Sequence, residues 1–427
     1  MKNSRLMTIA LAFLLVVVIS AGAYTAPRIE FWMQNYDNLP VQTKLMRELI
    51  AEFKKETGIT VDIEYVNWAE AMNRWTLVAS GGAAPDAGDM YWMYTFTDMG
   101  GGKHGPMPLD QYENELGLDR FFPSSLADVK YRGHTYGVPW RIDIRPMAYR
   151  TDLLAEAGFD GPPETWEDLI VYGQKLTKKG ADGRVERYGI ALRSNIDSQQ
   201  VLPWVWQAGG EIMSADGKTA QIDTPEMREA MQFVRDLIYK HEVASPAITD
   251  PSYVETDEFK AGRAAIVDHV GAGLKRDLEL TAPQLVPVLA GAPPVGHKER
   301  YAFSGAGYFG VLYGTKNVDA CVQWISFLGR ADVQLRLSQN LNQYSPNLEA
   351  ARDPYFMDDP WGANVVNTLQ YAHTSQHPSP AYSQIMSKGP GGVMFDLWHA
   401  VIYNQEPLDD ILKVAQAKAQ ELMDRVR

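Results

Sequence analysis

The sequence predicts an α/β fold in two lobes, each with strands that alternate with helices. Short runs rich in Val, Ile, Tyr and Phe alternate with segments whose apolar residues recur every three or four positions. Such alternation predicts a parallel sheet with helical crossovers. The chain has 427 residues, which at about 100–200 residues per domain suggests two domains.

The first series of elements follows the N-terminal segment. RIEFW (28–32) predicts a buried strand, and the segment that follows predicts an amphipathic helix because its apolar residues share one face. Gly58 is a natural stop for this helix. The series continues with a strand in ITVDIEYV, a helix over 68–80 and a third strand in PDAGDMYW.

A second series begins near residue 145. RPMAYR predicts a strand and TDLLAEAGF a helix, and Thr165 is placed to cap the next helix. No flexible linker separates the two series, so we expect lobes joined by shared strands or short hinges. The further expected elements are helices at 203–208, 225–241, 318–337 (one or two) and 408–426, and strands at 264–270 and 284–290.

The composition excludes some classes of partner. The formal net charge is −13, from 40 Lys+Arg and 53 Asp+Glu, and no basic run is present. A nucleic-acid-binding protein presents a basic face to the phosphates, so this class is not expected. The hydrophobic content of 45% is that of a globular protein.

The N-terminus is typical of a secretory signal peptide. Lys2 and Arg5 precede an apolar run, which ends in the small residues SAGA. We expect cleavage after Ala23, although retention as a membrane anchor is an open alternative. Tyr24 stands where a lipoprotein would need its cysteine, and Cys321 is the only cysteine in the chain. We therefore expect an exported, periplasmic protein with no lipid anchor and no internal disulfide.

No motif indicates catalysis or a bound cofactor. GAGYFG (305–310) matches G-x-G-x-x-G, but VLYGT after it predicts a strand where a dinucleotide site needs a helix. We interpret this stretch as a loop whose glycines let another segment or a ligand approach closely. His373 and His377 precede prolines, so a loop is favoured over a metal site. A pair of glycosidase carboxylates cannot be recognised by spacing, which keeps a carbohydrate-active enzyme as an alternative.

Aromatic residues beside turn signals are the most informative feature. Sugars stack their C–H faces on aromatic rings, and their hydroxyl groups need charged or amide partners. Open α/β sheets bind ligands at the carboxyl ends of their strands, where several of these residues fall. The aromatic candidates are Trp32, Trp92, Tyr94, Trp140, Trp204, Trp206, Tyr308 and Trp398.

Six stretches, in order, resemble the extracellular solute-binding proteins of ABC importers, in the group that contains the maltose-binding proteins. LIAEFKKETGITVDIEYV is similar to that family's first helix and second strand, and ASGGAAPDAGDMYW to its small-Gly-x-x-Pro-Asp signature. VKYRGHTYGVPW and YRTDLLAEAGFDGPPETWEDLIVYGQKLT resemble its next two segments. EFKAGRAAIVDHV and QWISFLGRADVQ resemble a later strand and helix.

The resemblance implies a two-lobed periplasmic-binding-protein fold of type II, with a ligand cleft between the lobes. By that likeness the first lobe holds residues 27–141 and 288–330, and the second holds 144–286 and 333–427. The hinges would lie near 141–144, 286–288 and 330–333.

The resemblance also implies where the ligand is held. Asp143 stands four residues beyond Pro139, where the family often has an acidic residue that binds sugar hydroxyls. Arg145 would donate to ligand oxygens or pair with Asp143. The implied ligand-binding residues are Trp32, Tyr36, Asp37, Trp92, Tyr94, Trp140, Asp143, Arg145, Gln199, His269, Tyr308 and Trp398.

The function implied is non-enzymatic and requires neither cofactor nor metal. A monomeric binding protein would capture a sugar by closing its cleft and deliver it to an ABC permease. Departures at Tyr36–Asp37 and Met93–Tyr94 make maltose doubtful, and a polyol or another solute stays open. A phosphate ligand would need more cationic donors than the predicted cleft offers.

Overall fold

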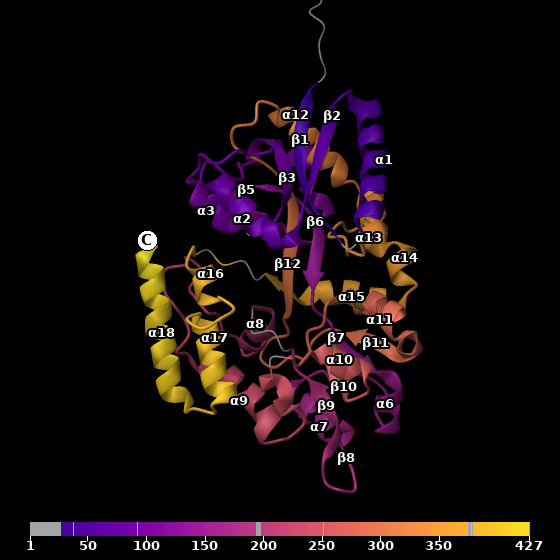
Figure 1. The fold of residues 1–427 in the computed structure, drawn as a ribbon, viewed down its shortest axis with the longest axis vertical. Helices are drawn as coiled ribbons and strands as arrows, with labels where there is room; N and C mark the ends of the chain where they lie inside the picture. Colours follow the sequence, from indigo (N-terminus) through magenta and orange to yellow (C-terminus); the bar gives the residue numbers. More distant parts are fainter. Residues whose placement is uncertain are drawn as a thin grey trace, which may run out of the picture.

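The structure is a computed structural model in which two lobes are stacked along the long axis of the molecule (Figure 1). It describes residues 27–36, 38–91, 93–193, 198–250, 252–374, 377 and 379–426. The first lobe is built on one sheet and the second lobe on another, and helices cover both.

The sheet of the first lobe is mixed rather than wholly parallel. β1, β2 and β3 are parallel to one another as the sequence predicts, but β12 runs antiparallel to both β3 and β6. In spatial order its strands are β13 (Ala372–Thr374), β12 (Ala302–Val311), β3 (Ala87–Met90), β1 (Arg28–Gln34) and β2 (Thr60–Val66), with β6 (Gly137–Ile144) paired to β12.

Within the described part of the chain, the sheet of the second lobe has five strands. In spatial order they are β11 (Leu289–Ala292), β7 (Met147–Arg150), β10 (Ala264–Val267), β9 (Val185–Ala191) and β8 (Lys178–Lys179). A short hairpin on the first lobe pairs β4 (Lys130–Tyr131) with β5 (His134–Thr135).

Local sequence signals explain where the long helices begin and end. The Asn38 side chain accepts a hydrogen bond from the Val41 amide at the start of α1, and Gly58 ends that helix with a left-handed φ of 79°. Thr165 forms the predicted cap of α7, with Asp168 completing a capping box. The first-lobe helices are α1 (Leu39–Thr57), α2 (Trp68–Ala79), α3 (Met93–Gly100), α4 (Glu113–Leu116), α5 (Pro123–Ala127), α12 (Val318–Leu328) and α13 (Ala331–Leu341).

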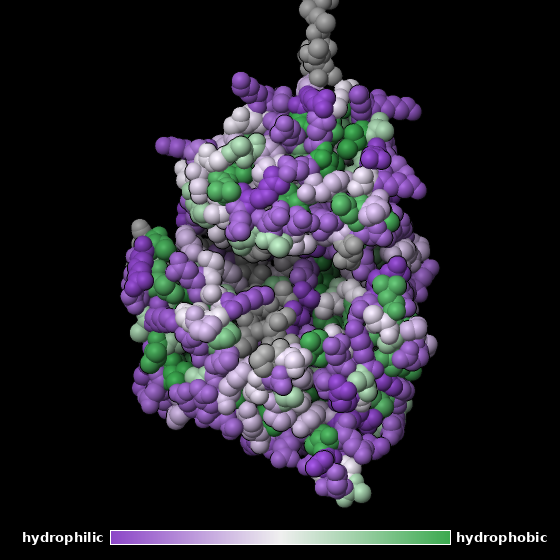
Figure 2. Space-filling model, viewed as in Figure 1, coloured by the Kyte–Doolittle hydropathy of each residue, from purple (hydrophilic) through white to green (hydrophobic). Residues whose placement is uncertain are grey.

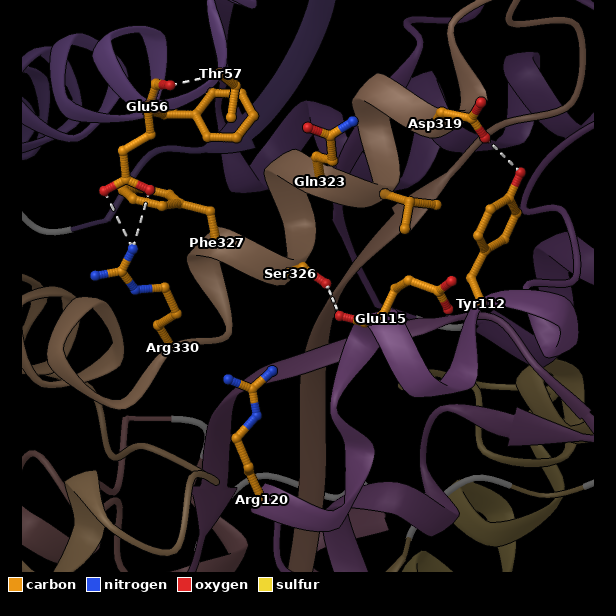
Figure 3. A pocket seen from close by; sticks show the side chains of 12 residues that line it. Glu56, Thr57, Tyr112, Glu115, Arg120, Asp319, Gln323, Ser326, Phe327 and Arg330 are labelled. Atoms are coloured by element: carbon orange, nitrogen blue, oxygen red, sulfur yellow. Dashed lines mark hydrogen bonds and ion pairs between the residues drawn. The ribbon is translucent and has the colours of Figure 1, made fainter.

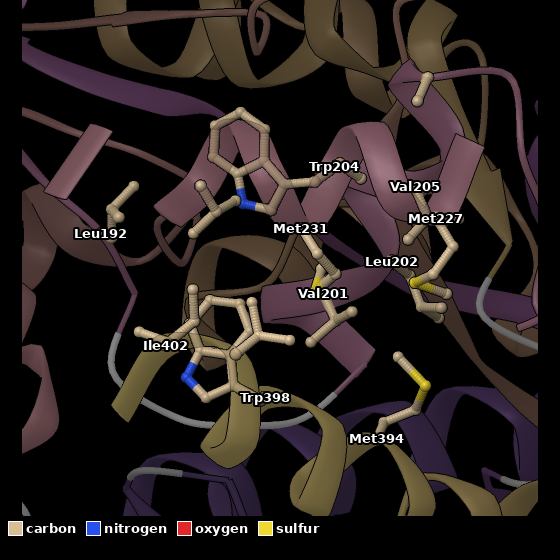
Figure 4. Close-up of a cluster of buried hydrophobic side chains, with 14 of the residues drawn as sticks. Leu192, Val201, Leu202, Trp204, Val205, Met227, Met231, Met394, Trp398 and Ile402 are labelled. Carbon is tan, nitrogen blue, oxygen red and sulfur yellow. The ribbon is translucent and has the colours of Figure 1, made fainter. Parts of the chain in front are cut away.

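The remaining helices accompany the second sheet and the junction between the lobes. They are α6 (Thr151–Glu156), α7 (Trp166–Leu176), α8 (Ser198–Gln207), α9 (Pro225–Tyr239), α10 (Glu255–Lys260), α11 (Leu274–Thr281), α14 (Pro354–Met357), α15 (Pro360–Thr368), α16 (Tyr382–Ile385), α17 (Val393–Trp398) and α18 (Leu408–Arg425). Figure 4 shows the apolar contacts of α8, α9 and α17 in the core of the second lobe.

The chain crosses between the lobes near the first predicted hinge. The other two crossings lie further along the sequence than the predicted hinges. β6 ends in the first sheet and β7 begins in the second, so the first crossing lies at 145–146. The predicted strand over 284–290 is wrong, because a 3₁₀ helix precedes β11, and β11 itself pairs in the second sheet. The second crossing therefore lies between β11 and β12. Since α13 packs in the first-lobe core, the third follows Leu341 instead of lying at 330–333.

GAGYFG lies inside the fully buried strand β12, so its interpretation as a loop was wrong. Close approach of another segment does explain one of its glycines. A Cβ on Gly307 would stand 2.8 Å from the hydroxyl oxygen of Tyr91 and 2.9 Å from its ring. Glycine at this strand position therefore lets the Tyr91 ring lie against the β12 backbone.

Candidate functional site

A cavity of about 400 Å³ lies between the lobes, where Figure 2 shows the surface hollowed. First-lobe residues, the last residues of β6, a second-lobe glycine segment and the chain after α13 all contribute to its wall. The lining residues are Tyr36, Trp68, Arg141, Ile142, Asp143, Arg145, Gly271, Ala272, Gly273, Asn342, Gln343 and Tyr344.

Three aromatic residues reach this region because each follows one of the parallel strands of the first lobe. Tyr36 follows β1, Trp68 begins α2 just after β2, and Tyr91 follows β3. Parallel strands bring their carboxyl ends to one edge of the sheet, which is the usual ligand edge of open α/β sheets. The Trp68 ring lies 5.2 Å from the Tyr91 ring and 6.1 Å from the Tyr36 ring. The three rings therefore form one aromatic cluster.

The guanidinium group of Arg141 lies within this cluster. Its central carbon is 4.5 Å from the ring centroid of Tyr91, 4.9 Å from that of Tyr36 and 5.1 Å from that of Trp68. Its Nη1 donates to Oε1 of Gln343 over 2.8 Å. The faces of aromatic rings attract cations, so the cluster holds this positive charge at a fixed place in the cavity wall.

Asp143 and Arg145 form an ion pair at the same wall. Nη2 of Arg145 donates to Oδ2 of Asp143 over 2.8 Å, and their side chains are 14% and 30% exposed, respectively. Gly271 faces this pair from the second lobe, where an added Cβ would stand 2.8 Å from Nη1 of Arg145. The sequence left open whether Arg145 pairs with Asp143, and the structure has the pair.

A buried carboxylate supports the aromatic cluster from behind. Asp89 accepts hydrogen bonds from the Tyr36 hydroxyl (2.7 Å), from Nε1 of Trp140 (2.8 Å) and from the Gln34 amide (3.3 Å). Burial raises the pKa of Asp89 to about 6, and these hydrogen bonds and the charge of Arg141 oppose the rise. Asp89 therefore fixes the ring of Tyr36 in the wall of the cavity.

Of the residues proposed from sequence, the structure brings Tyr36, Asp143 and Arg145 to the interlobe cavity. Two others make different contacts in the first lobe. Trp32 lies 5.2 Å from the Trp75 ring and under the guanidinium group of Arg74. Tyr94 stacks on Tyr131 at 4.4 Å, and its hydroxyl donates to backbone carbonyls.

Four further proposals fall on fully buried side chains, so placing them in the wall of the cleft was wrong. Trp140 stacks on Phe309 in the first-lobe core. Tyr308 packs beside Met90, and Trp398 lies in the apolar core of the second lobe. His269 is 0% exposed and contacts the carboxylate of Asp268. Sequence position made these four residues candidates, but their side chains pack inside the two lobes.

Asp37 and Trp92 lie outside the described residues, as does the side chain of Gln199. Their roles in ligand binding stay predictions.

Several lining residues were not predicted from the sequence. Trp68 follows a predicted strand, so the strand-end argument used for the other aromatic residues could have found it. Arg141 gave no separate signal, because its contacts depend on three rings from distant segments. Residues 342–344 follow α13, beyond the predicted third hinge at 330–333, and no local pattern marks them.

A larger cavity of about 570 Å³ lies on the first lobe alone. Figure 3 shows Arg330 bonded to Glu56 and the Tyr112 hydroxyl bonded to Asp319 in this cavity. Only first-lobe elements wall this cavity, so movement of the lobes would not close it. The interlobe cavity is therefore the candidate site.

The described residues hold no cluster of His, Cys, Asp or Glu suited to a metal ion. His373 lies in β13 rather than in the predicted loop, and its Nε2 lies 3.1 Å from Oε1 of Glu211. Burial lowers the pKa of His377 to about 4. Across the described part of the chain, no helix combines the length and apolar character needed to cross a membrane.

The family of this chain follows from comparison with known proteins. The profile described as bacterial extracellular solute-binding protein matches residues 37–335, which is more than half of the chain. The chain therefore belongs to the family of bacterial extracellular solute-binding proteins, as its sequence motifs predict.

Individual relatives are more distant. The maltotriose-binding protein of Pyrococcus abyssi is 25% identical over 313 residues, which are 72% of this chain and 61% of that protein. The arabinooligosaccharide-binding protein of Halalkalibacterium halodurans is 29% identical over 169 residues, 39% of this chain and 35% of its own length. Both matches span less than two thirds of the relative.

Solved structures of similar fold cover nearly the whole chain. The sugar-binding protein MalE from Xanthomonas citri has a TM-score of 0.80 at 20% identity, covering 93% of this chain and 98% of that one. The maltose-bound MalE3 of T. maritima has a TM-score of 0.72 at 22% identity, covering 93% and 100%. At these identities the likeness concerns the fold, and it confirms the predicted two-lobed fold of type II periplasmic binding proteins.

Proposed function

We propose that this protein is the substrate-binding component of an ABC importer and that its ligand is a sugar. One observation carries the proposal: the interlobe cavity combines an aromatic cluster with charged and amide side chains. Rings that stack on a sugar face and polar groups that bind its hydroxyls are the two requirements of carbohydrate recognition. The names of the relatives, which are maltotriose- and arabinooligosaccharide-binding proteins, agree with it.

The mechanism we propose is closure of the lobes around the ligand. In the open state the ligand meets Tyr36, Trp68 and the residues of β6, and only the closed state adds the backbone of Gly271–Gly273. A ligand that makes more contacts in the closed state shifts the equilibrium toward it. The short crossings between the sheets are the places where such a hinge motion is absorbed. No bond is broken, and the closed form delivers the sugar to a membrane permease.

We further propose that the chain is exported to the periplasm, cleaved after Ala23, and works there as a monomer without a lipid anchor. The order of charged, apolar and small residues before Tyr24 supports export and cleavage. N-terminal sequencing of the exported protein tests it, because a retained Met1 would contradict cleavage.

A thermal-shift screen over mono-, di- and trisaccharides and polyols, followed by calorimetry and product analysis, tests the binding proposal. A ligand that binds the native state raises the melting temperature. A rise with one class of sugar and no new product supports a binding protein. Turnover of an oligosaccharide would instead indicate an exported carbohydrate-active enzyme. A rise with polyols alone would replace the sugar by a polyol.

A further inference from the structure

The described residues that line the interlobe cavity have a net charge opposite in sign to that of the whole protein. Arg141, Arg145 and Asp143 are the charged residues that line it among the described parts of the chain, which gives a net charge of +1. The formal net charge of the whole chain is −13. An excess of cationic side chains in the cleft of an acidic protein favours an anionic ligand, because the walls of a cleft focus the field on what enters.

Arg141 has no carboxylate partner among the described residues. Its positive charge is compensated by the faces of Tyr36, Trp68 and Tyr91, and its Nη1 donates to the neutral amide of Gln343. Aromatic faces attract a cation but do not use its in-plane N–H donors. Its Nε is buried and has no hydrogen-bond partner within the described structure.

Asp89, the nearby buried carboxylate, does not form an ion pair with Arg141. It lies behind Tyr36, and its two oxygens already accept from the Tyr36 hydroxyl, Nε1 of Trp140 and the Gln34 amide.

Arg145, like Arg141, has a buried N–H group without an acceptor among the described residues. Its Nη2 is used by Asp143, but its Nε is buried and has no hydrogen-bond partner in the described part of the chain. Buried donors in native proteins are normally satisfied, and each exception needs an explanation. Two guanidinium groups beside one cavity therefore carry N–H donors that no described residue uses.

We infer that the ligand is an acidic sugar, one that carries a carboxylate group, and this rests on the proposed function. A planar guanidinium group matches a carboxylate with two parallel hydrogen bonds, which makes it a better partner for an acid than for a neutral hydroxyl. The aromatic cluster holds Arg141 in one orientation and offers ring surface beside it for the sugar. A cavity of about 400 Å³ is within the usual range for small-molecule sites.

Calorimetry with matched sugars tests the inference on the full exported protein. D-galacturonate and D-galactose differ only at C6, as do D-glucuronate and D-glucose, and digalacturonate with galactobiose extends the comparison. We expect the acid of at least one pair to bind tenfold or more tightly than its neutral counterpart. Tighter binding of the neutral sugar would overturn the inference and leave the proposed function standing. Failure of acidic and neutral sugars alike would overturn both.

Substitutions at Arg141 sharpen the test. Arg141→Gln is expected to reduce the acid-to-neutral affinity ratio at least tenfold, whereas Arg141→Lys keeps the charge and retains part of the ratio. Arg145→Gln is a second variant with the same expected direction. Arg74→Gln is the matched control, because Arg74 also covers an aromatic ring, that of Trp32, away from the cavity. Folded Arg141→Gln and Arg145→Gln proteins that both keep the preference for the acid would overturn the inference.

Discussion

The two walls of the cleft differ in what they offer a ligand. The first-lobe wall presents large side chains, with Tyr36 and Trp68 beside Arg141, whereas the second-lobe wall in the described structure is the short segment Gly271–Gly273. Side chains provide ring surface and charge, whereas a glycine segment provides backbone groups and close approach. The difference indicates that the first lobe selects the ligand and that the second lobe covers it.

The prediction with the largest expected effect concerns Trp398, which the structure places away from the second-lobe wall of the cleft. The sequence placed Trp398 in the cleft, but it lies 1% exposed in the core of the second lobe (Figure 4). Trp398→Ala should therefore lower the free energy of unfolding by about 3–5 kcal/mol, the usual cost of removing a large buried aromatic side chain. Urea unfolding measures this loss, and the folded fraction should keep its affinity for ligand. If Trp398→Ala had normal stability and weakened ligand binding, Trp398 would belong to the second-lobe wall of the cleft after all.

The second prediction concerns the carboxylate behind the first wall. Burial raises the pKa of Asp89 from 3.8 to about 6, so the native state holds the proton more tightly than the unfolded state. The resulting stability is fully present below about pH 4 and is lost as the pH rises through 6. At about 1.4 kcal/mol per pKa unit, this amounts to up to about 3 kcal/mol.

Asp89→Asn should make the free energy of unfolding fall less between pH 4 and pH 7. The pH dependence that remains in this variant is expected from Asp128, because burial also raises the pKa of that carboxyl group, to about 7. Urea titrations at several pH values, with Asp128→Asn as the parallel variant, measure both contributions. An unchanged slope in Asp89→Asn would mean that Asp89 titrates normally in the native state.

The third prediction removes the most exposed ring of the first wall. Trp68 is 39% exposed, so Trp68→Ala should leave stability nearly unchanged and weaken ligand binding by about 1–3 kcal/mol, from lost apolar burial. Calorimetry with the ligand from the sugar screen measures the loss. Val171→Ala serves as a control, since Val171 is an exposed apolar residue, 48% exposed, on α7. Equal affinity of Trp68→Ala and wild type would remove this ring from the site.

The sequence predicted several elements in both series well because their signals are local. The apolar stripe of α1, the stop at Gly58 and the cap at Thr165 each act within a few residues, and all three are present. β12 was missed because its glycines indicate a turn, whereas the Tyr91 ring packed against Gly307 explains one of them. That contact joins residues more than 200 positions apart, which no local pattern encodes.

The site was predicted in part, for a related reason. The family resemblance implied Tyr36, in the loop after the first strand, and Asp143, four residues beyond Pro139, because both positions belong to short segments. The same reasoning also selected Trp140 and Tyr308, which face the core. Which side of a strand is buried depends on the helices packed against it, so sequence position alone could not separate these rings from the ring of Tyr36.

The smallest expected effect tests the second wall directly. An added Cβ at Gly271 would stand 2.8 Å from Nη1 of Arg145, the flexible end of a side chain that can move away. The backbone of Gly271 does not adopt a left-handed φ, so the effect of Gly271→Ala is steric rather than conformational. We expect a loss of about 1 kcal/mol in ligand affinity, at the low end of the cost of overpacking, with stability unchanged.

Gly161→Ala is the matched control, because a Cβ there meets nothing within 4 Å. If the second lobe covers the ligand with its backbone, the methyl group at Gly271 should act mainly on the closed state. Stopped-flow measurements should then show faster ligand release with little change in the association rate, as most interface substitutions do. A slower association with unchanged release would mean that Gly271 contacts the ligand before closure. Both lobes, and not the first alone, would then select the ligand.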